Sequence, residues 1–422
     1  MDEEHSTQGE DAQKTRILIA YKEFPAPSVG HAGGQGVFRL IRVLHQRGHS
    51  VILVARLRRE EAAWVEETRP FCERIVTVPH HQALSGPLPL RIARSYLALR
   101  RAVARTLRET RPDLMLVEFT QTALVLLGLR RPFTAVRPHD VNWFLLEQRS
   151  RYQKGLRRMG TLALARLFGH LEPWLLRRYN QILAISEGDR RLLMLRCRPI
   201  PTLLLPLAPA LSAETPSHPI VPPGPNVLFV GAMYRGPNIE AVDWFLSQVW
   251  PKVTAEVPEA RFYAVGYGPP PQMLARADGE RIFVTGYADD LTPWYQAATV
   301  FVSPVQVAGG LLQKVLDALA MGVPVVATSV SNHGIGASPG RHLITADDPE
   351  EFAAAVVQLL RDPVRREQLG QAGQEFVRAR YDLDEALDRW EATTLKSRGT
   401  QRAQRITDGK KTYDSAPSAA LQ

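Results

Sequence analysis

A segment near residue 310 combines a glycine pair with one lysine and one aspartate at helical spacing. The segment, Ala308 to Thr328, reads AGGLLQKVLDALAMGVPVVAT. Gly309 and Gly310 precede a predicted helix whose first turn carries Lys314, with Asp317 three residues later. Free backbone N–H groups at a helix start favour a bound anion, and an ammonium group adds to this. We interpret the segment as a diphosphate site in which Asp317 accepts hydrogen bonds from sugar hydroxyls.

A plainer interpretation stays open for the same two side chains. Lys314 and Asp317 are three residues apart on the predicted helix, so they could form a surface ion pair that contributes only about 0.3 kcal/mol. The chain has eight lysines against 44 arginines. A lysine at this position in such a chain favours a functional role.

A second glycine-rich segment, GHAGGQG, spans residues 30–36 between a predicted strand and a predicted helix. Glycines at such a junction let the backbone approach a ligand, and the helix start beyond them favours an anion. The segment is not the dinucleotide-binding fingerprint, because the later glycine and the acidic residue after the second strand are missing. It is either a ligand-binding loop or a flexible turn.

Together these segments resemble the GT-B-fold glycosyltransferases of family 4 (group 1). The resemblance covers about residues 16–395, and several segments look like the sugar transferases of bacterial exopolysaccharide assembly. Further segments that carry it are LHQRGHSVILV from Leu44, RPHDVNW from Arg137, LAISEGDR from Leu183, LFVGAMYRGPN from Leu228 and VTGYADDLTPWYQAATVFVSP from Val284. The resemblance implies an α/β protein in which two Rossmann-like domains, each a doubly wound parallel sheet, face a cleft.

The resemblance also implies roles for individual residues. Lys314 matches the lysine that stabilises the diphosphate of the donor, and Asp317 matches a glutamate that contacts the nucleotide ribose. The other implied positions are Gly33 and Gly34 near the donor phosphate and the acceptor, His139 in the sugar pocket, and Gly286 and Tyr287 in the loop that holds the nucleobase.

This chain departs from the family pattern at three places. The first glutamate of the family pair, which is assigned to the transferred sugar, falls at Gly309, and the second is shortened to Asp317. Many relatives have an arginine and then a lysine after the strand NVLFVG, where this chain has Ala232 and Asn238. Arg235, between them, is either a phosphate clamp or a solvated loop residue. Gly309, Gly310, Arg235 and Asn238 complete the donor-binding candidates.

These departures leave two functional classes open. The first is a glycosyltransferase that moves a sugar from a nucleotide-diphosphate sugar to a glycan or lipid-linked acceptor, with retention, in polysaccharide biosynthesis. Its catalytic candidates are Lys314, Asp317 and His139. The second is a non-catalytic GT-B-like protein that binds a nucleotide sugar or a partner transferase.

We expect the reaction to need neither a metal nor a cofactor. Sugar transfer places charge on the leaving diphosphate, which Lys314, the helix start and Arg235 could stabilise. The only D-x-D string, Asp382 to Asp384, begins the last predicted helix and is typical of N-capping acids. No histidine has a second ligand at metal spacing.

Two basic stretches, residues 91–111 and 149–178, interleave arginine with large apolar residues. The second stretch has Glu172 as its only acid. Two interpretations remain for them. They are either a peripheral membrane surface, where each arginine contributes about 1 kcal/mol with anionic headgroups, or amphipathic helices with a solvated basic face. The basic half shows no recognisable nucleic-acid-binding module.

The amino-acid composition and the distribution of charge indicate which class of protein this is. The 422 residues are 45% hydrophobic and 23% charged, which is typical of a globular chain. The net charge is +9, with +14 in residues 1–210 and −5 in residues 211–422. Two cysteines exclude a disulfide scaffold. The polar, acidic N-terminus and the absence of long apolar runs predict a cytoplasmic protein, at most peripheral at the inner face of the plasma membrane.

Strands and helices alternate in two blocks, which predicts two parallel sheets covered on both faces. Nine prolines between Pro199 and Pro225 separate the blocks and indicate a stiff linker. The predicted division is a disordered start (1–15), an N-terminal acceptor domain (16–205), a Pro-rich linker (206–225), a C-terminal donor domain (226–381), a C-terminal helix (382–397) and a disordered tail (398–422).

Overall fold

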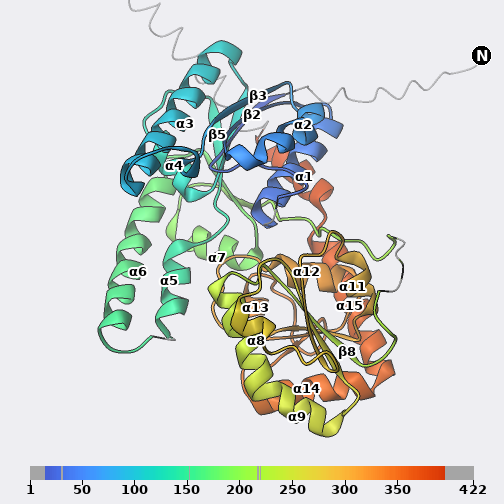
Figure 1. Ribbon diagram of the computed structural model, residues 1–422. Coiled ribbons are helices and arrows are strands. Elements are labelled where there is room, and N and C mark those ends of the chain that lie inside the picture. Colours follow the sequence, from blue (N-terminus) through green and yellow to red (C-terminus); the bar gives the residue numbers. More distant parts are fainter. Residues whose placement is uncertain (1–14, 30–31, 152, 216–217, 219, 395–422) are drawn as a thin grey trace, which may run out of the picture.

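The chain folds into two α/β lobes (Figure 1). The computed structural model describes residues 15–394 except 30–31, 152, 216–217 and 219. The N-terminal lobe has a seven-stranded sheet of order β3-β2-β1-β4-β5-β6-β7, and the C-terminal lobe has a six-stranded sheet of order β10-β9-β8-β11-β12-β13. The strands of both sheets pair in parallel. The predicted fold class, two doubly wound parallel sheets, is confirmed.

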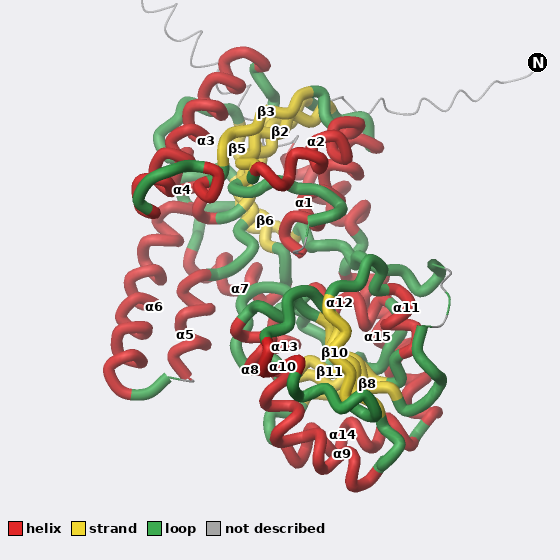
Figure 2. Tube along the Cα trace, in the orientation of Figure 1, coloured by secondary structure: helices red, strands yellow, loops and turns green. Residues whose placement is uncertain are grey.

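The N-terminal lobe alternates strands and helices along the chain. Its strands are β1 (Arg16–Tyr21), β2 (Ser50–Leu57), β3 (Arg74–Pro79), β4 (Leu114–Glu118), β5 (Phe133–Arg137), β6 (Gln181–Ala184) and β7 (Thr202–Leu204). Its helices are α1 (Ala32–Gln46), α2 (Ala62–Thr68), α3 (Leu88–Thr110), α4 (Thr120–Leu126), α5 (Asn142–Arg151), α6 (Gly155–Leu176) and α7 (Glu187–Arg196). Helices α5 and α6 extend away from the sheet as a pair (Figure 2).

The C-terminal lobe repeats the alternation. Its strands are β8 (Asn226–Val230), β9 (Arg261–Val265), β10 (Ile282–Gly286), β11 (Val300–Ser303), β12 (Val325–Ala327) and β13 (Ile344–Thr345). Its helices are α8 (Gly236–Trp244), α9 (Trp250–Glu256), α10 (Pro271–Leu274), α11 (Thr292–Ala297), α12 (Gln313–Ala320), α13 (Ser329–His333), α14 (Pro349–Arg361) and α15 (Pro363–Arg380), with a π-helical turn at Phe245–Val249.

The strands are apolar on both faces because helices cover both. In β1, Ile17 and Ile19 join one buried cluster, whereas Leu18 and Ala20 join the cluster on the other face. Successive strand residues point to opposite faces. Helices on both sides therefore require the continuous apolar runs that the sequence shows. The carboxyl ends of the parallel strands then carry the loops that can bind a ligand.

The sequence prediction was wrong at two places in this architecture. β7 lies in the proline-rich stretch that begins at Pro199, where no strand was predicted, although it falls inside the predicted N-terminal domain (16–205). It is a three-residue edge strand bounded by prolines, too short to show a period. In addition, α1 begins at Ala32, so Gly33 and Gly34 lie in its first turn and not in a loop. Glycine is tolerated in this helix because Gly36 packs on Leu207, whose Cδ2 lies 2.4 Å from the place of a Cβ.

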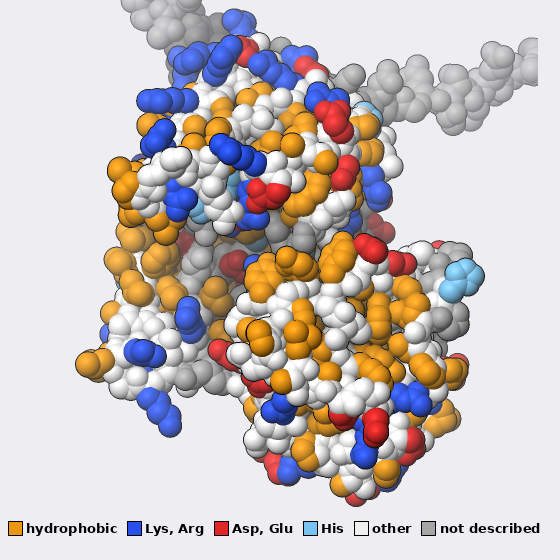
Figure 3. All heavy atoms as spheres, in the orientation of Figure 1, with side chains coloured by type: hydrophobic (Ala, Val, Ile, Leu, Met, Phe, Trp, Pro, Cys, Tyr) orange, Lys and Arg blue, Asp and Glu red, His pale blue; other side chains and the backbone are white. Residues whose placement is uncertain are grey.

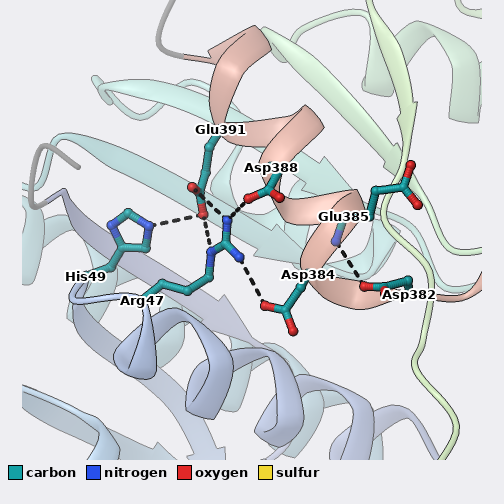
Figure 4. Close-up of polar contacts among 7 residues, drawn as sticks. All are labelled: Arg47, His49, Asp382, Asp384, Glu385, Asp388 and Glu391. Atoms are coloured by element: carbon teal, nitrogen blue, oxygen red, sulfur yellow. Dashed lines mark hydrogen bonds and ion pairs between the residues drawn. The ribbon is translucent and has the colours of Figure 1, made fainter. Parts of the chain in front are cut away.

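The predicted C-terminal helix is present at residues 383–394 and returns to the N-terminal lobe (Figure 4). Arg47 follows α1 and forms ion pairs with Asp384, Asp388 and Glu391 of this helix. Asp382 caps the helix by accepting the Glu385 N–H at 3.0 Å. Of the two predicted capping acids, Asp382 therefore caps, whereas Asp384 binds Arg47 at 3.0 Å.

The apolar face of the same helix completes the N-terminal core. Leu387 and Trp390 belong to the buried cluster that contains β1 and α1 side chains. The Trp390 Nε1–H donates to Gln181 Oε1 at 2.8 Å. The predicted disordered ends, 1–15 and 398–422, lie outside the described residues except for Thr15. Within the described ranges, no helix combines the length and apolar character that crossing a membrane requires.

We expect Trp390→Ala to lower the free energy of unfolding by about 3–5 kcal/mol, because it leaves a cavity in the N-terminal core and removes the hydrogen bond to Gln181. Urea unfolding followed by circular dichroism measures the change. Arg389→Ala is the matched control on the same helix. Arg389 forms only an exposed ion pair with Glu385, so its loss should cost less than about 1 kcal/mol. Equal effects of the two substitutions would contradict this account.

Candidate active site

Lys314 lies in the first turn of α12, beside the carboxyl end of β8; the residue as a whole is half-buried, and protein surrounds its ammonium group. Its Nζ donates to Asn238 Oδ1 at 2.7 Å and lies 4.0 Å from the centre of the Phe229 ring. Asp317 is buried and faces other partners. The interpretation of Lys314 and Asp317 as a surface ion pair is therefore wrong.

The Lys314 ammonium has no carboxylate beside it. Among the described residues, none forms an ion pair with it, and its nearest polar partner is the neutral Asn238. Burial, and to a smaller extent the positive charge of Arg235, lower the pKa of Lys314 to about 7. A buried cation without a counter-ion is costly. The site is therefore electrostatically prepared for an anion.

Asn238 stands where many relatives of the resembled family have a lysine. Its Nδ2 donates to the Ala232 carbonyl at 2.9 Å, which turns Oδ1 toward Lys314. Gly231 leaves room for this contact, because a Cβ there would lie 2.8 Å from Asn238 Nδ2 and 3.1 Å from Lys314 Nζ. The ammonium from α12 thus reaches the side chain that replaces the lysine of α8.

Arg235 precedes α8 and is exposed. Its charge acts on both Lys314 and Asp140, which places it at the entrance to the Lys314 site. A guanidinium at this position can contact a phosphate bound below it. Both predicted interpretations of Arg235 fit an exposed side chain, and the phosphate clamp stays a prediction.

Tyr287 lies in a row of exposed tyrosines beside this entrance. It packs edge-to-face on Tyr267 at 6.2 Å between ring centres, and Tyr267 packs on Tyr234 at 6.1 Å. Gly286 ends β10 with φ +77°, a conformation that favours glycine. The sequence prediction named Gly286 and Tyr287 but missed the other two rings, which come from the loops after β8 and β9.

Asp317 binds the segment that joins the lobes. Its Oδ1 accepts the Ala210 N–H at 2.7 Å and Gln313 Nε2–H at 2.9 Å. Burial raises the pKa of Asp317 to about 6, and hydrogen bonds to the carboxylate oppose this shift. The carboxylate that the resemblance predicts to contact the ribose therefore also binds, through the Ala210 N–H, the chain segment that joins the two lobes. Gly33 and Gly34 begin α1, whose Arg39 reaches the same segment by donating to the Ala208 carbonyl at 3.2 Å.

His139 follows β5 and is held by a buried charged pair. Its Nε2 lies 2.7 Å from Glu118 Oε2, which also accepts from Arg137 Nε at 3.0 Å. Burial lowers the pKa of His139, which favours the neutral ring. With Nε2–H donated to Glu118, the other ring nitrogen, Nδ1, is an acceptor.

Phe119 supports this histidine in an uncommon backbone conformation. Its φ is +70° at the end of β4, and its ring stacks on His139 with centres 3.8 Å apart. The Lys22 ammonium lies 4.4 Å from the centre of the same ring. The sequence prediction missed Glu118, Phe119 and Lys22. Glu118 could have been found from the sequence, because it is a carboxylate at the end of a strand whose other residues are all apolar.

The glycine pair before α12 touches the His139 loop of the other lobe. Gly310 has φ +65°, and a Cβ there would lie 2.5 Å from the His139 carbonyl oxygen. A Cβ at Gly309 would lie 3.0 Å from Leu145 Cδ1. Close approach between the lobes and a positive φ require glycine at position 310, whereas at position 309 the neighbouring side chains would have to shift by a few tenths of an ångström. Nearby, His333 of α13 stacks on Phe144 of α5 at 4.5 Å.

The structure thus brings Lys314, Asn238 and Arg235 together in the C-terminal lobe, and sets Gly309 and Gly310 against His139 of the N-terminal lobe. In the part of the chain that the structure describes, no group of three or more His, Cys, Asp or Glu side chains is arranged to hold a metal ion.

Comparison with known proteins agrees with this architecture. The model of "Glycosyltransferase Family 4" matches residues 33–202, and the model of "Glycosyl transferases group 1" matches residues 224–362. A phosphatidyl-myo-inositol mannosyltransferase of Mycobacterium leprae is 34% identical over 166 residues, 38% of this chain and 43% of that protein. The chain spans about two fifths of the length of the curated relatives that it matches.

Solved structures share the fold over nearly the whole chain. Sucrose-phosphate synthase from Thermosynechococcus elongatus superposes with a TM-score of 0.68 at 18% identity, covering 94% of this chain and 100% of that one. HepE from Anabaena, in complex with UDP and glucose, gives a TM-score of 0.61 at 14% identity and covers 91% and 100%. The two family models match both lobes, and the chain belongs to the group 1, family 4 glycosyltransferases of the GT-B fold.

Proposed function

We propose that this protein transfers a sugar from a nucleotide-diphosphate sugar to a glycan or lipid-linked acceptor in polysaccharide biosynthesis. The transfer retains the configuration at the anomeric carbon and needs neither a metal nor a cofactor. The observation that carries the proposal is the Lys314 ammonium, which protein surrounds at a helix start and which has no carboxylate partner among the residues that the structure describes.

The proposed mechanism follows from where charge develops. The bond between the anomeric carbon and the diphosphate oxygen breaks, and its electrons stay on the diphosphate. The acceptor oxygen bonds to the same face of the anomeric carbon and gives its proton to the departing diphosphate oxygen. Lys314, the N–H groups that begin α12 and Arg235 stabilise the departing diphosphate. Asp317 accepts from the ribose, and His139 accepts from a sugar hydroxyl through Nδ1.

Membership of the family and the bound molecules of relatives support the choice of donor. HepE was solved with UDP-glucose, with UDP and with UDP plus glucose, and one relative is named as GDP-mannose-dependent. The alternative is a non-catalytic protein that binds a nucleotide sugar or a partner transferase. Its support is the missing family glutamate at Gly309.

The test is turnover of a panel of UDP- and GDP-sugars, with release of nucleoside diphosphate as the readout, in the presence of EDTA. We expect turnover to persist in EDTA and Lys314→Ala to lower it about 10²–10³-fold, the scale of losing one preorganised charge. The binding of nucleoside diphosphates is measured separately, from the rise that they cause in the melting temperature of the protein. Binding without release would favour the non-catalytic alternative, and activity restored only by Mn²⁺ or Mg²⁺ would contradict metal independence.

The pKa of Lys314 predicts how donor binding changes with pH. In the free protein this pKa is about 7, so the ammonium loses its proton as the pH rises through 7. A bound diphosphate stabilises the ammonium and raises its pKa. Affinity for the nucleotide sugar should therefore be highest below pH 7 and fall by up to about tenfold per pH unit above it.

Titration calorimetry between about pH 6.5 and 9 measures this dependence, in a range where Asp317, with a pKa of about 6, is mostly ionised. Lys314→Arg is the control, because a guanidinium keeps its charge throughout. A pH-independent affinity in the unchanged protein would show that Lys314 does not bind the diphosphate.

We further propose that the outer face of α6 binds anionic lipid and so brings the enzyme to a lipid-linked acceptor. Along most of α6 the small residues Ala165 and Gly169 are buried, whereas large apolar side chains are exposed; at its end, Leu175 and Leu176 are buried. The exposed set is Leu156 (85%), Met159, Leu164, Leu167, Phe168, Leu171 and Trp174. Figure 3 shows hydrophobic and basic side chains along this edge of the molecule.

Charge on α6 favours an anionic surface. Arg157, Arg158 and Arg166 are exposed on it. The single acid, Glu172, is buried, where it accepts from Asn142 Nδ2 at 2.6 Å and Thr120 Oγ1 at 2.8 Å. The exposed face of this helix is therefore apolar and positive, which is the composition that binds at a lipid interface.

Flotation with liposomes tests this surface. We expect binding to vesicles that contain anionic lipid and weaker binding to neutral vesicles, since each arginine contributes about 1 kcal/mol. Replacing Arg157, Arg158 and Arg166 by glutamine should weaken binding about 100-fold and leave turnover of a water-soluble acceptor unchanged. Arg365→Gln on the other lobe is the control. Equal binding to neutral vesicles, or self-association that accounts for the apolar face, would overturn the proposal.

A further inference from the structure

We propose that Asp140 supplies the carboxylate that binds the transferred sugar, in place of the glutamate that this chain lacks at Gly309. The inference rests on the proposed function and assigns a role to a residue that the sequence prediction did not name. It explains how a chain with a glycine at the family's sugar-binding position can still recognise a sugar.

The position of Asp140 carries the inference. Asp140 follows His139 at the carboxyl end of β5 in the N-terminal lobe. Its Oδ1 lies 3.1 Å from the place that a Cβ of Gly309 would occupy and 3.0 Å from that of Gly310. A carboxylate from one lobe therefore occupies the space in which a side chain at position 309 of the other lobe would begin.

The carboxylate of Asp140 is also not used by the protein. Asp140 is half-buried, and no side-chain hydrogen bond or ion pair joins it to another described residue. The positive or titratable groups near it are Lys22, His139 and Arg235, and the carboxyl of Asp189 also lies close enough for Asp140 to raise its pKa. The first three groups favour the ionised form of Asp140, whereas burial raises its pKa. The half-buried carboxylate thus keeps its acceptor capacity at the contact between the lobes, where a ligand hydroxyl can donate to it in place of water.

The chemistry around Asp140 suits a polyhydroxylated ring. A carboxylate accepts hydrogen bonds from adjacent hydroxyls, and the neighbouring His139 offers Nδ1 as a further acceptor. Lys314 and Arg235 stand on the opposite lobe. A nucleotide sugar would thus place its diphosphate on the C-terminal lobe and its sugar hydroxyls against the N-terminal lobe.

Donor analogues that lack single hydroxyls test the assignment. With the best donor of the panel, Asp140→Asn should lower kcat/KM about 10–100-fold, the effect of losing a hydrogen bond to a charged group. Nucleoside diphosphate binding, measured by thermal shift, should be unchanged. For a donor analogue that lacks the hydroxyl bound by Asp140, we expect the unchanged protein and Asp140→Asn to have the same low kcat/KM. Asp243→Asn on α8 is the matched control and should leave all three measurements unchanged.

The outcomes separate this inference from the proposed function. If the unchanged protein binds no nucleotide and turns over no donor, the proposed function fails. If it turns over a donor and Asp140→Asn stays within threefold of it, the inference alone fails. Loss of nucleotide binding together with a lower melting temperature in Asp140→Asn would also overturn the inference, because Asp140 would then hold the lobes together instead of binding the sugar.

Discussion

The site depends on a positive charge kept inside the protein without an opposite charge beside it. Burial destabilises the Lys314 ammonium, and the protein offsets this only in part, with the Asn238 oxygen and the Phe229 ring. Neighbouring features serve this arrangement. Gly231 leaves space for it, and Ala232 orients the asparagine. A nearby carboxylate would stabilise the lysine better, but it would also neutralise the charge that an anionic ligand needs.

The fold and part of the site could be predicted from sequence because they depend on local patterns. The buried strands appeared as apolar runs, and the helix carrying Lys314 followed a glycine pair. β7 could not be found, because three residues between prolines show no period. Glu118 and Asp140 were missed for a different reason: their roles depend on contacts with residues far away in the chain, such as His139 and Gly309, which only the folded topology brings close.

Two of the three departures from the family pattern can be followed in three dimensions. A lysine expected on α8 is replaced by Asn238, and an ammonium from α12 reaches that asparagine. A glutamate expected before α12 is replaced by Gly309, and Asp140 reaches that glycine from the N-terminal lobe. Alignment by position reports two losses. In the structure, a carboxylate of the N-terminal lobe lies against Gly309, whereas at position 238 a neutral amide contacts Lys314, the lysine that this chain retains.

The docking of residues 383–394 on the N-terminal lobe has a mechanical consequence. The chain passes between the lobes once after β7 and again before this last helix, which Arg47 and Trp390 fasten to the N-terminal lobe. Two lobes that are joined by two chain segments rotate most easily about the line through the two connections. Rotation about any other axis would stretch one of the two connecting segments. Opening and closing of this protein should therefore follow a single preferred axis.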